Sequence, residues 1–308
     1  MSATKKRLHD LYRCRDAAEF ATAFADATGR KVGDVVRGLC IVDDPCGIVL
    51  GGSLPLGLGT ATSDVDLLVL LDNPDGETLT KPSARTGVVF AGRAAEGGGG
   101  VACGEVVAFI EGIEVNCQLL SAVSVEHASR RIARAQIALT PYEIGLMSRL
   151  KTGWTLERTA TFDARCAPLL GDEALELHSA VWYLVGAMQD LEDARAALAD
   201  CTPLALHLGR SAAERGVLAY FASRGIAYIG AKWLRAFEPA QAAGRVGVLA
   251  GDFPGGREAL RILFPGFPDA AGYVERVAAF VADLRRDIET LPACRIAIAL
   301  CPQLRTAA

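Results

Sequence analysis

The sequence predicts an α+β protein, in which a small head with a mixed β-sheet and flanking helices is followed by a helical bundle. Three observations support this class. Short continuous apolar runs, typical of strands buried on both faces, occur between residues 47 and 121. From residue 173 onward the chain has the periodicity of long helices. The length of 308 residues, of which 51% are apolar, suits one large domain or two modest ones.

The elements of the head follow from local patterns. Residues 1–45 have a helical apolar periodicity through Phe20 and Phe24. GIVL (47–50) and VDLLVLL (65–71) predict two buried strands, and TGVVFAGR (86–93) predicts a third. Four consecutive glycines within 94–104 predict a loop. Residues 104–120 predict a hairpin with Glu111-Gly112 at its turn.

The remainder of the chain predicts helices separated by short connections. Two helical segments are expected at 124–139 and 141–157, the second with Pro141 in its first turn. Residues 157–172 suggest a linker. Further helices are expected at 174–199, 204–225, 231–244 and 272–291. We therefore predict a domain boundary near 160, with a head at 1–160 that carries the helical extension 1–45, and a helical domain at 161–308.

Composition and charge exclude several classes of protein. The net charge of −4 provides no basic field for nucleic-acid phosphates, so a nucleic-acid partner is disfavoured. No apolar run has the roughly 18 residues that a membrane helix needs, so no membrane partner is expected. The nine cysteines form no C-x-x-C pair and the four histidines have no metal-ligand spacing. We expect reduced thiols, a cytoplasmic location and no zinc site.

The segment GGSLPLGLGTATSDVDLLVLL (51–71) carries the strongest chemical signal. Asp64 and Asp66 are two residues apart at the start of a strand, so their side chains share one face. Two close carboxylates repel each other unless a cation lies between them, and hard oxygen ligands suit Mg²⁺. Gly52 allows close approach of a phosphate, and Ser53 adds a hydroxyl. Separately, a G-G-S is usually a turn and a D-x-D an exposed strand end, but together they predict a phosphoryl or nucleotidyl transfer site.

This arrangement resembles the DNA polymerase beta-like nucleotidyltransferase superfamily. The resemblance rests on Leu50-Gly51-Gly52-Ser53, ten intervening residues, and then Asp64-Val65-Asp66. Thr60 and Ser63 in the spacer also match, whereas Pro55 is less typical and suggests a stiffened helix start after Ser53. The resemblance covers residues 45–120 firmly and 140–235 loosely, and is closest to small antibiotic-type enzymes, such as the aminoglycoside and lincosamide nucleotidyltransferases.

The resemblance also implies further site residues. A third carboxylate on a later strand corresponds to EGIEVNCQLL, where Glu114 and Asn116 share one face. Glu114 is favoured, and with Asp64 and Asp66 it would hold two Mg²⁺ ions; Asn116 in its place would remove one anionic ligand. Lys151 or Arg149 corresponds to a cation near the triphosphate, although helix-end cations also complement the helix dipole. Lys232 corresponds to a lysine of the helical substrate-binding domain.

The resemblance implies transfer of an NMP from an NTP, with ATP favoured, to a hydroxyl of a small-molecule acceptor with release of pyrophosphate. Residues 1–160 would then be the catalytic domain and residues 161–308 the substrate-binding domain. A homodimer is compatible with this family. Two alternatives stay open at this point: a cyclic-nucleotide synthase, and a nucleotide-binding regulatory or antitoxin-like protein whose site has decayed at Asn116.

Overall fold

The structure is a computed structural model that describes residues 11, 13–40, 44–59, 63–74, 89–90, 103–134, 139–171, 173–227, 234, 262–263 and 269–291. The chain divides into two compact units. Unit 1 contains the β-sheet with helices α2, α3, α6 and α7 and α5 as far as Arg131, and unit 2 contains α8, α9 and α13. The predicted boundary near 160 falls at the start of α7, and the assignment of a catalytic and a substrate-binding role to the two parts stays a prediction.

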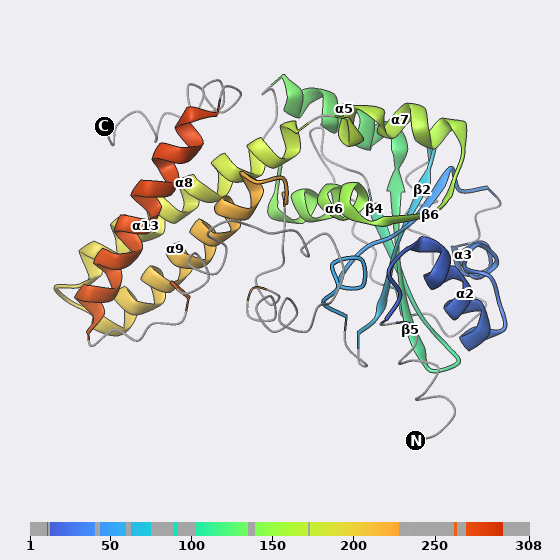
Figure 1. Cartoon of the computed structure of the whole chain (residues 1–308), viewed down its shortest axis with the longest axis horizontal. Coiled ribbons are helices and arrows are strands. Elements are labelled where there is room, and N and C mark those ends of the chain that lie inside the picture. The colour runs from blue at the N-terminus through green and yellow to red at the C-terminus, as the bar shows by residue number, and fades with distance from the viewer. Residues whose placement is uncertain are drawn as a thin grey trace. The chain divides into compact units, whose positions relative to one another are not determined.

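Unit 1 is built on a six-stranded mixed sheet with the order β3-β4-β5-β2-β1-β6 (Figure 1). The pairing of β2 with β5 is parallel, and the other pairs are antiparallel. An α+β class with a mixed sheet is therefore confirmed. The strands are β1 (Gly47–Leu50), β2 (Val65–Leu71), β3 (Val89–Phe90), β4 (Cys103–Ile110), β5 (Ile113–Ser121) and β6 (Trp154–Arg158).

The hairpin of β4 and β5 turns at Glu111 and Gly112, as predicted from the sequence. Both residues have positive φ, 50° and 82°, which is the requirement of a two-residue type I′ turn. The turn fixes the register, because Ile110 pairs with Ile113 and Phe109 with Glu114. This register decides which side chains of the hairpin share a face.

One face of the sheet is covered by α2 (Ala17–Thr28) and α3 (Val32–Cys40), which lie beside the strands in Figure 1. The Asp16 side chain caps α2, and Gly29 ends it with a φ of 69°. Phe20 and Phe24 are fully buried in a cluster with alternate residues of β1, β2, β4 and β5. The strand members of that cluster are Ile48, Leu50, Val65, Leu67, Val69, Leu71, Val106, Ala108, Ile113, Val115, Cys117 and Leu119.

The remaining helices of this unit are α5 (Ala122–Ala133), α6 (Pro141–Thr152) and α7 (Ala160–Leu170). A capping box formed by Thr140 and Glu143 begins α6, with Pro141 in the first turn as predicted. The α7 residue Phe162 packs on β1, because a Cβ on Gly47 would lie 2.2 Å from its ring. Alternate residues of β1 and β2 that point away from α2 and α3, such as Val49 and Leu68, are also fully buried. The two strands are thus buried on both faces, as predicted.

Three local predictions were wrong. The segment 153–158 is not the end of a helix, because Gly153 ends α6 and Trp154–Arg158 pairs with β1 as an edge strand. The expected linker at 157–172 is helix α7, which begins at the capping residue Thr159. No helix follows Ser53; residues 52–57 form turns, in which Pro55 and Gly57 oppose helix propagation.

The described part of unit 2 includes the long helices α8 (Ala174–Ala197), α9 (Thr202–Ala222) and α13 (Ala270–Thr290). Their predicted positions are confirmed, whereas the segment 231–244 lies outside the described residues except for Leu234. Asp190 of α8 joins α9, since it accepts a 2.6 Å hydrogen bond from Ser211 and lies 3.1 Å from Arg215. None of the helices described is both long and apolar enough to cross a lipid bilayer.

An ion-pair network ties α5 and α7 to the end of β2 in unit 1. The Arg165 guanidinium of α7 donates to Asp72 at 3.0 Å and to Glu126 at 2.8 Å. Glu126 is only 6% exposed and also pairs with Arg130 at 2.6 Å. The hydrogen bond from Arg165 lowers the pKa of Glu126, and this effect exceeds the opposing effect of burial.

We expect Glu126→Gln to lower the melting temperature at pH 7 by several degrees, and to do so much less near pH 3. Stability from a carboxylate with a lowered pKa is fully present above the unfolded value of about 4.3, and is lost as the pH falls through the folded pKa. Thermal melts between pH 3 and 7 measure this. Glu157→Gln is the matched control, because its pair with Arg37 is 40% exposed at both side chains and contributes little. Equal shifts for the two variants would contradict the prediction.

Candidate active site

The chain leaves β1 through a glycine-containing turn. Gly52 and Gly57 have φ values of 71° and 69°, a region that L-residues other than glycine rarely adopt. The turn is closed by two backbone hydrogen bonds, from Gly57 N to Leu54 O at 3.0 Å and from Leu58 N to Ser53 O at 2.9 Å. Ser53 is 3% exposed. The predicted phosphate-binding segment is therefore a compact and locally determined turn.

This turn lies directly against Asp66 of β2. A Cβ built on Gly52 would come within 2.0 Å of Asp66 Oδ2, so only a glycine leaves room for that carboxylate. The backbone holds the same contact, because Gly51 N donates to Asp66 O at 2.8 Å. Residue spacing alone does not bring the glycine turn and Asp66 together. The antiparallel pairing of β1 with β2 brings them into contact.

The predicted acidic residues share one face of the sheet. In the parallel pair of β2 and β5, Asp66 is opposite Asn116. Asp64 and Glu114 each lie one residue before the first registered pair, Val65 with Val115, so they continue the same face. Asp64, Asp66 and Asn116 are half-buried and Glu114 is exposed. The structure thus brings the two aspartates beside both candidates for the third position.

Two amide oxygens on this face of β5, Asn116 Oδ1 and Gln118 Oε1, have no hydrogen-bond partner among the described residues. A buried acceptor without a donor costs about 1–3 kcal/mol, so each of these oxygens needs a partner from water, an ion or a ligand. The Asn116 oxygen is adjacent to Asp66 in register, and carboxylate and amide oxygens are the ligand types that hard cations take.

The acidic residues of this face could bind a magnesium ion only together with ligands from water and the substrate. Among the described residues, no three His, Cys, Asp or Glu side chains converge closely enough to hold a metal by themselves. Mg²⁺ commonly uses one or two carboxylates and completes its shell with water and substrate phosphates. Asp64 and Asp66, beside a turn that only glycine can make, match this requirement.

The C-terminal end of α6 meets the same turn. A Cβ on Gly51 would lie 3.2 Å from Arg149 Cβ, and one on Gly153 would lie 2.5 Å from the carbonyl oxygen of Leu50. Arg149 Nε donates to Gly145 O of its own helix at 3.2 Å, and Lys151 is half-buried in the last helical turn. Arg149 therefore contacts the glycine turn, and both cations also complement the helix dipole.

Not every predicted residue can be placed. Ser63 is half-buried just before the two aspartates, whereas Thr60 and Lys232 lie outside the described residues. The sequence interpretation missed Phe109, which is 71% exposed and pairs with Glu114 on the acidic face. The signal was present, because a two-residue turn at Glu111-Gly112 fixes that pairing.

The segment that carries the glycine turn and the two aspartates matches a family model. Residues 42–98 match the family described as nucleotidyltransferase domain. No curated protein shows significant similarity to the sequence. Among solved structures, a nucleotidyltransferase-like protein from Exiguobacterium sibiricum 255-15 is similar with a TM-score of 0.42 and 10% identity, over 87% of this chain and 77% of that chain. The turn after β1 and the Asp64/Asp66 pair both lie inside the matched segment, so the family model and the sequence pattern point to the same superfamily.

Proposed function

We propose that this protein is a Mg²⁺-dependent enzyme that transfers an NMP from an NTP, with ATP as the favoured nucleotide, to a hydroxyl of a small-molecule acceptor and releases pyrophosphate. The observation that carries the proposal is the contact between Gly52 and Asp66, where an added Cβ would lie 2.0 Å from Oδ2. This contact supports the proposal, because a turn of a kind suited to phosphate lies against one of two carboxylates of a kind suited to a cation.

In this proposal the turn at 51–53 seats the triphosphate, and Arg149 or Lys151 offsets its charge. Asp64 and Asp66 would hold the magnesium, which when bound neutralises phosphate charge and polarises the reacting oxygens. The acceptor oxygen forms a bond to the α-phosphorus and loses its proton, while the bond from that phosphorus to the pyrophosphate oxygen breaks. The rigid strands β1 and β2 contribute by positioning, which is the main requirement of phosphoryl transfer.

The direct test is an assay with each of the four α-labelled NTPs, Mg²⁺ and a panel of hydroxylated small molecules. Labelled NMP–acceptor product together with pyrophosphate supports the proposal. A cyclic or linear dinucleotide formed without acceptor supports the synthase alternative. Nucleotide binding without turnover, measured by calorimetry, supports the regulatory alternative and contradicts our proposal. A cytoplasmic location and a homodimeric state belong to the same proposal.

The third carboxylate can be assigned with two substitutions on β5. We expect Glu114→Gln to lower kcat about 100-fold, the scale on which a site loses one group that stabilises the transition state. Steady-state transfer rates measure this. If residue 116, which is opposite Asp66, fills the position instead, Glu114→Gln leaves kcat unchanged. Asn116→Asp alone would then raise kcat, because it supplies the missing carboxylate.

A further inference from the structure

We propose that Phe109, Val107 and Asn116 form the acceptor subsite, which takes a hydroxyl compound with a flat apolar ring beside a group that donates a hydrogen bond. This inference rests on the proposed function and names the side of the carboxylates on which the acceptor binds. Neither the family match nor the sequence pattern assigns a role to Phe109 or Val107.

The position of Phe109 follows from strand register. Phe109 pairs with Glu114 and Val107 with Asn116 across the hairpin, and Asn116 pairs with Asp66 across the parallel strands. Registered partners point to the same face of a sheet, so Phe109 and Val107 share the face of Asp66. The next residue of β4 alternates to the other face, where Ala108 is buried in the cluster with α2 and α3.

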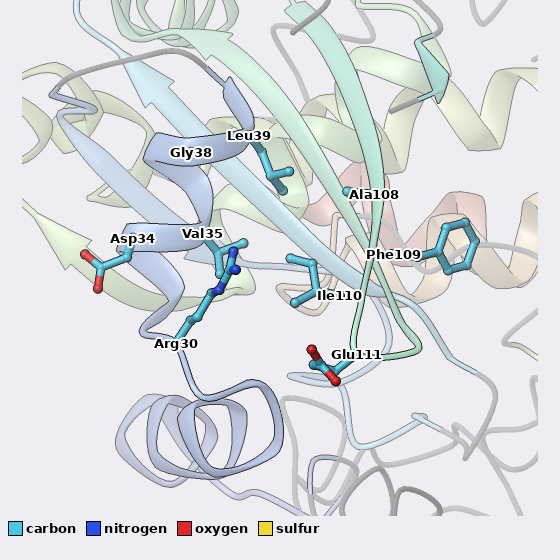
Figure 2. A pocket seen from close by; sticks show the side chains of 9 residues that line it. All are labelled: Arg30, Asp34, Val35, Gly38, Leu39, Ala108, Phe109, Ile110 and Glu111. Atoms are coloured by element: carbon cyan, nitrogen blue, oxygen red, sulfur yellow. The ribbon is translucent and has the colours of Figure 1, made fainter. Parts of the chain in front are cut away.

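Figure 2 shows the same division around a pocket of about 230 Å³ on the α3 face of the sheet. The side chains of Val35, Leu39 and Ile110 point into the pocket, whereas the Phe109 ring points to the opposite side of the strand (Figure 2). The ring is thus on the acidic face. An exposure of 71% for a large aromatic side chain means that the sheet itself supplies no cover for it.

The order of the strands indicates which substrate meets this ring. The turn that seats the triphosphate follows β1, the aspartates are on β2, and Phe109 is on β4 beyond β5. Phe109 and the phosphate turn therefore lie on opposite sides of the carboxylates. In-line displacement requires the attacking oxygen to approach opposite the leaving pyrophosphate. Phe109 and Val107 of β4 are consequently on the side of the carboxylates from which the acceptor approaches.

The side chains of this subsite indicate the chemical groups that the acceptor carries. The exposed ring of Phe109 and the half-buried Val107 offer an apolar surface that suits a flat ring. Beside them, Asn116 Oδ1 is buried and meets no donor in the part of the chain that the structure describes, so it can accept from an O–H or N–H group. An acceptor with a planar apolar part next to such a group would satisfy both features.

The test uses Phe109→Trp as a fluorescent reporter, with the wild-type chain as background. Phenyl β-glucoside and methyl β-glucoside serve as probes, because they share the sugar hydroxyls and differ in the flat ring. We expect the phenyl compound to change the reporter emission with a Kd about 3- to 10-fold lower than that of the methyl compound. Calorimetry should show that Phe109→Ala removes this difference.

Leu170→Trp is the matched control. Leu170 is 41% exposed and lies five residues after Arg165, which contacts Asp72 at the opposite end of β2. Neither glucoside should change the emission of this reporter. Equal affinities of the two glucosides for the Phe109→Trp protein would overturn the inference.

A separate experiment with α,β-methylene-ATP and Mg²⁺ tests whether the side chain at position 109 contacts the nucleotide. This analogue alone should leave the Phe109→Trp emission unchanged; strong quenching by it would assign the ring to the nucleobase and overturn the inference. A failure of the proposed function can be distinguished from a failure of this inference. It would appear as absent nucleotide binding and absent transfer, whatever the glucoside comparison gives.

Discussion

Asp66→Asn is expected to reduce nucleotidyl transfer by about 1000-fold or more while the protein stays folded. The substitution keeps the size and shape of the side chain but removes the negative charge that would hold a cation beside the triphosphate. The hydrogen bond from Gly51 N should persist, because it is accepted by the backbone carbonyl of Asp66. Initial rates of NMP transfer and thermal melts measure the two effects separately.

Asp26→Asn is the matched control for that variant. Asp26 is exposed on α2, the helix that covers the opposite face of the sheet, so its charge should not affect transfer. Asp64→Asn should behave as Asp66→Asn does, since the two side chains share one face. Wild-type transfer rates in the Asp66→Asn protein would show that this carboxylate has no part in the reaction, and the proposed mechanism would then be wrong.

Gly52→Ala is the second change with a large expected effect, and it acts on both stability and activity. A φ of 71° costs a residue other than glycine about 1–2 kcal/mol. The new methyl carbon would also lie 2.0 Å from Asp66 Oδ2, so the carboxylate must move. We expect a loss of more than about 1 kcal/mol of stability and a fall in kcat of about 100-fold, because displacement of a positioned group by even 1 Å has that effect.

Gly29→Ala isolates the backbone contribution. Gly29 has nearly the same φ, 69°, but a Cβ there would meet no atom within 4 Å. The Gly29→Ala variant should therefore lose stability through backbone strain alone and keep full transfer activity. Urea denaturation and transfer rates of both variants, compared in parallel, separate strain from the contact with Asp66. If the two variants retain equal activity, the contact does not matter for the reaction.

Local sequence signals determined much of the fold. Continuous apolar runs bounded by glycine and aspartate predict β1 and β2, and Glu111-Gly112 predicts the turn of the hairpin, because these signals depend only on neighbouring residues. The same local logic failed for β6, whose five residues form a strand only because the edge of β1 is available to pair with them. Helix α7 was missed since a short segment gives a weak periodic signal, although its cap at Thr159 was visible.

The same distinction between local sequence signals and tertiary structure applies to the candidate site. The sequence alone determined that Asp64 and Asp66 share a face and that a glycine turn precedes them, since both follow from residue spacing and type. Only the tertiary structure decided that Gly52 contacts Asp66, that Asn116 rather than Glu114 is opposite Asp66, and that the Phe109 ring is exposed. The pairing of β2 with β5 joins segments some fifty residues apart, and its register is fixed by burial of the opposite face against α2 and α3. No local pattern contains that information, because it arises when distant apolar surfaces pack together.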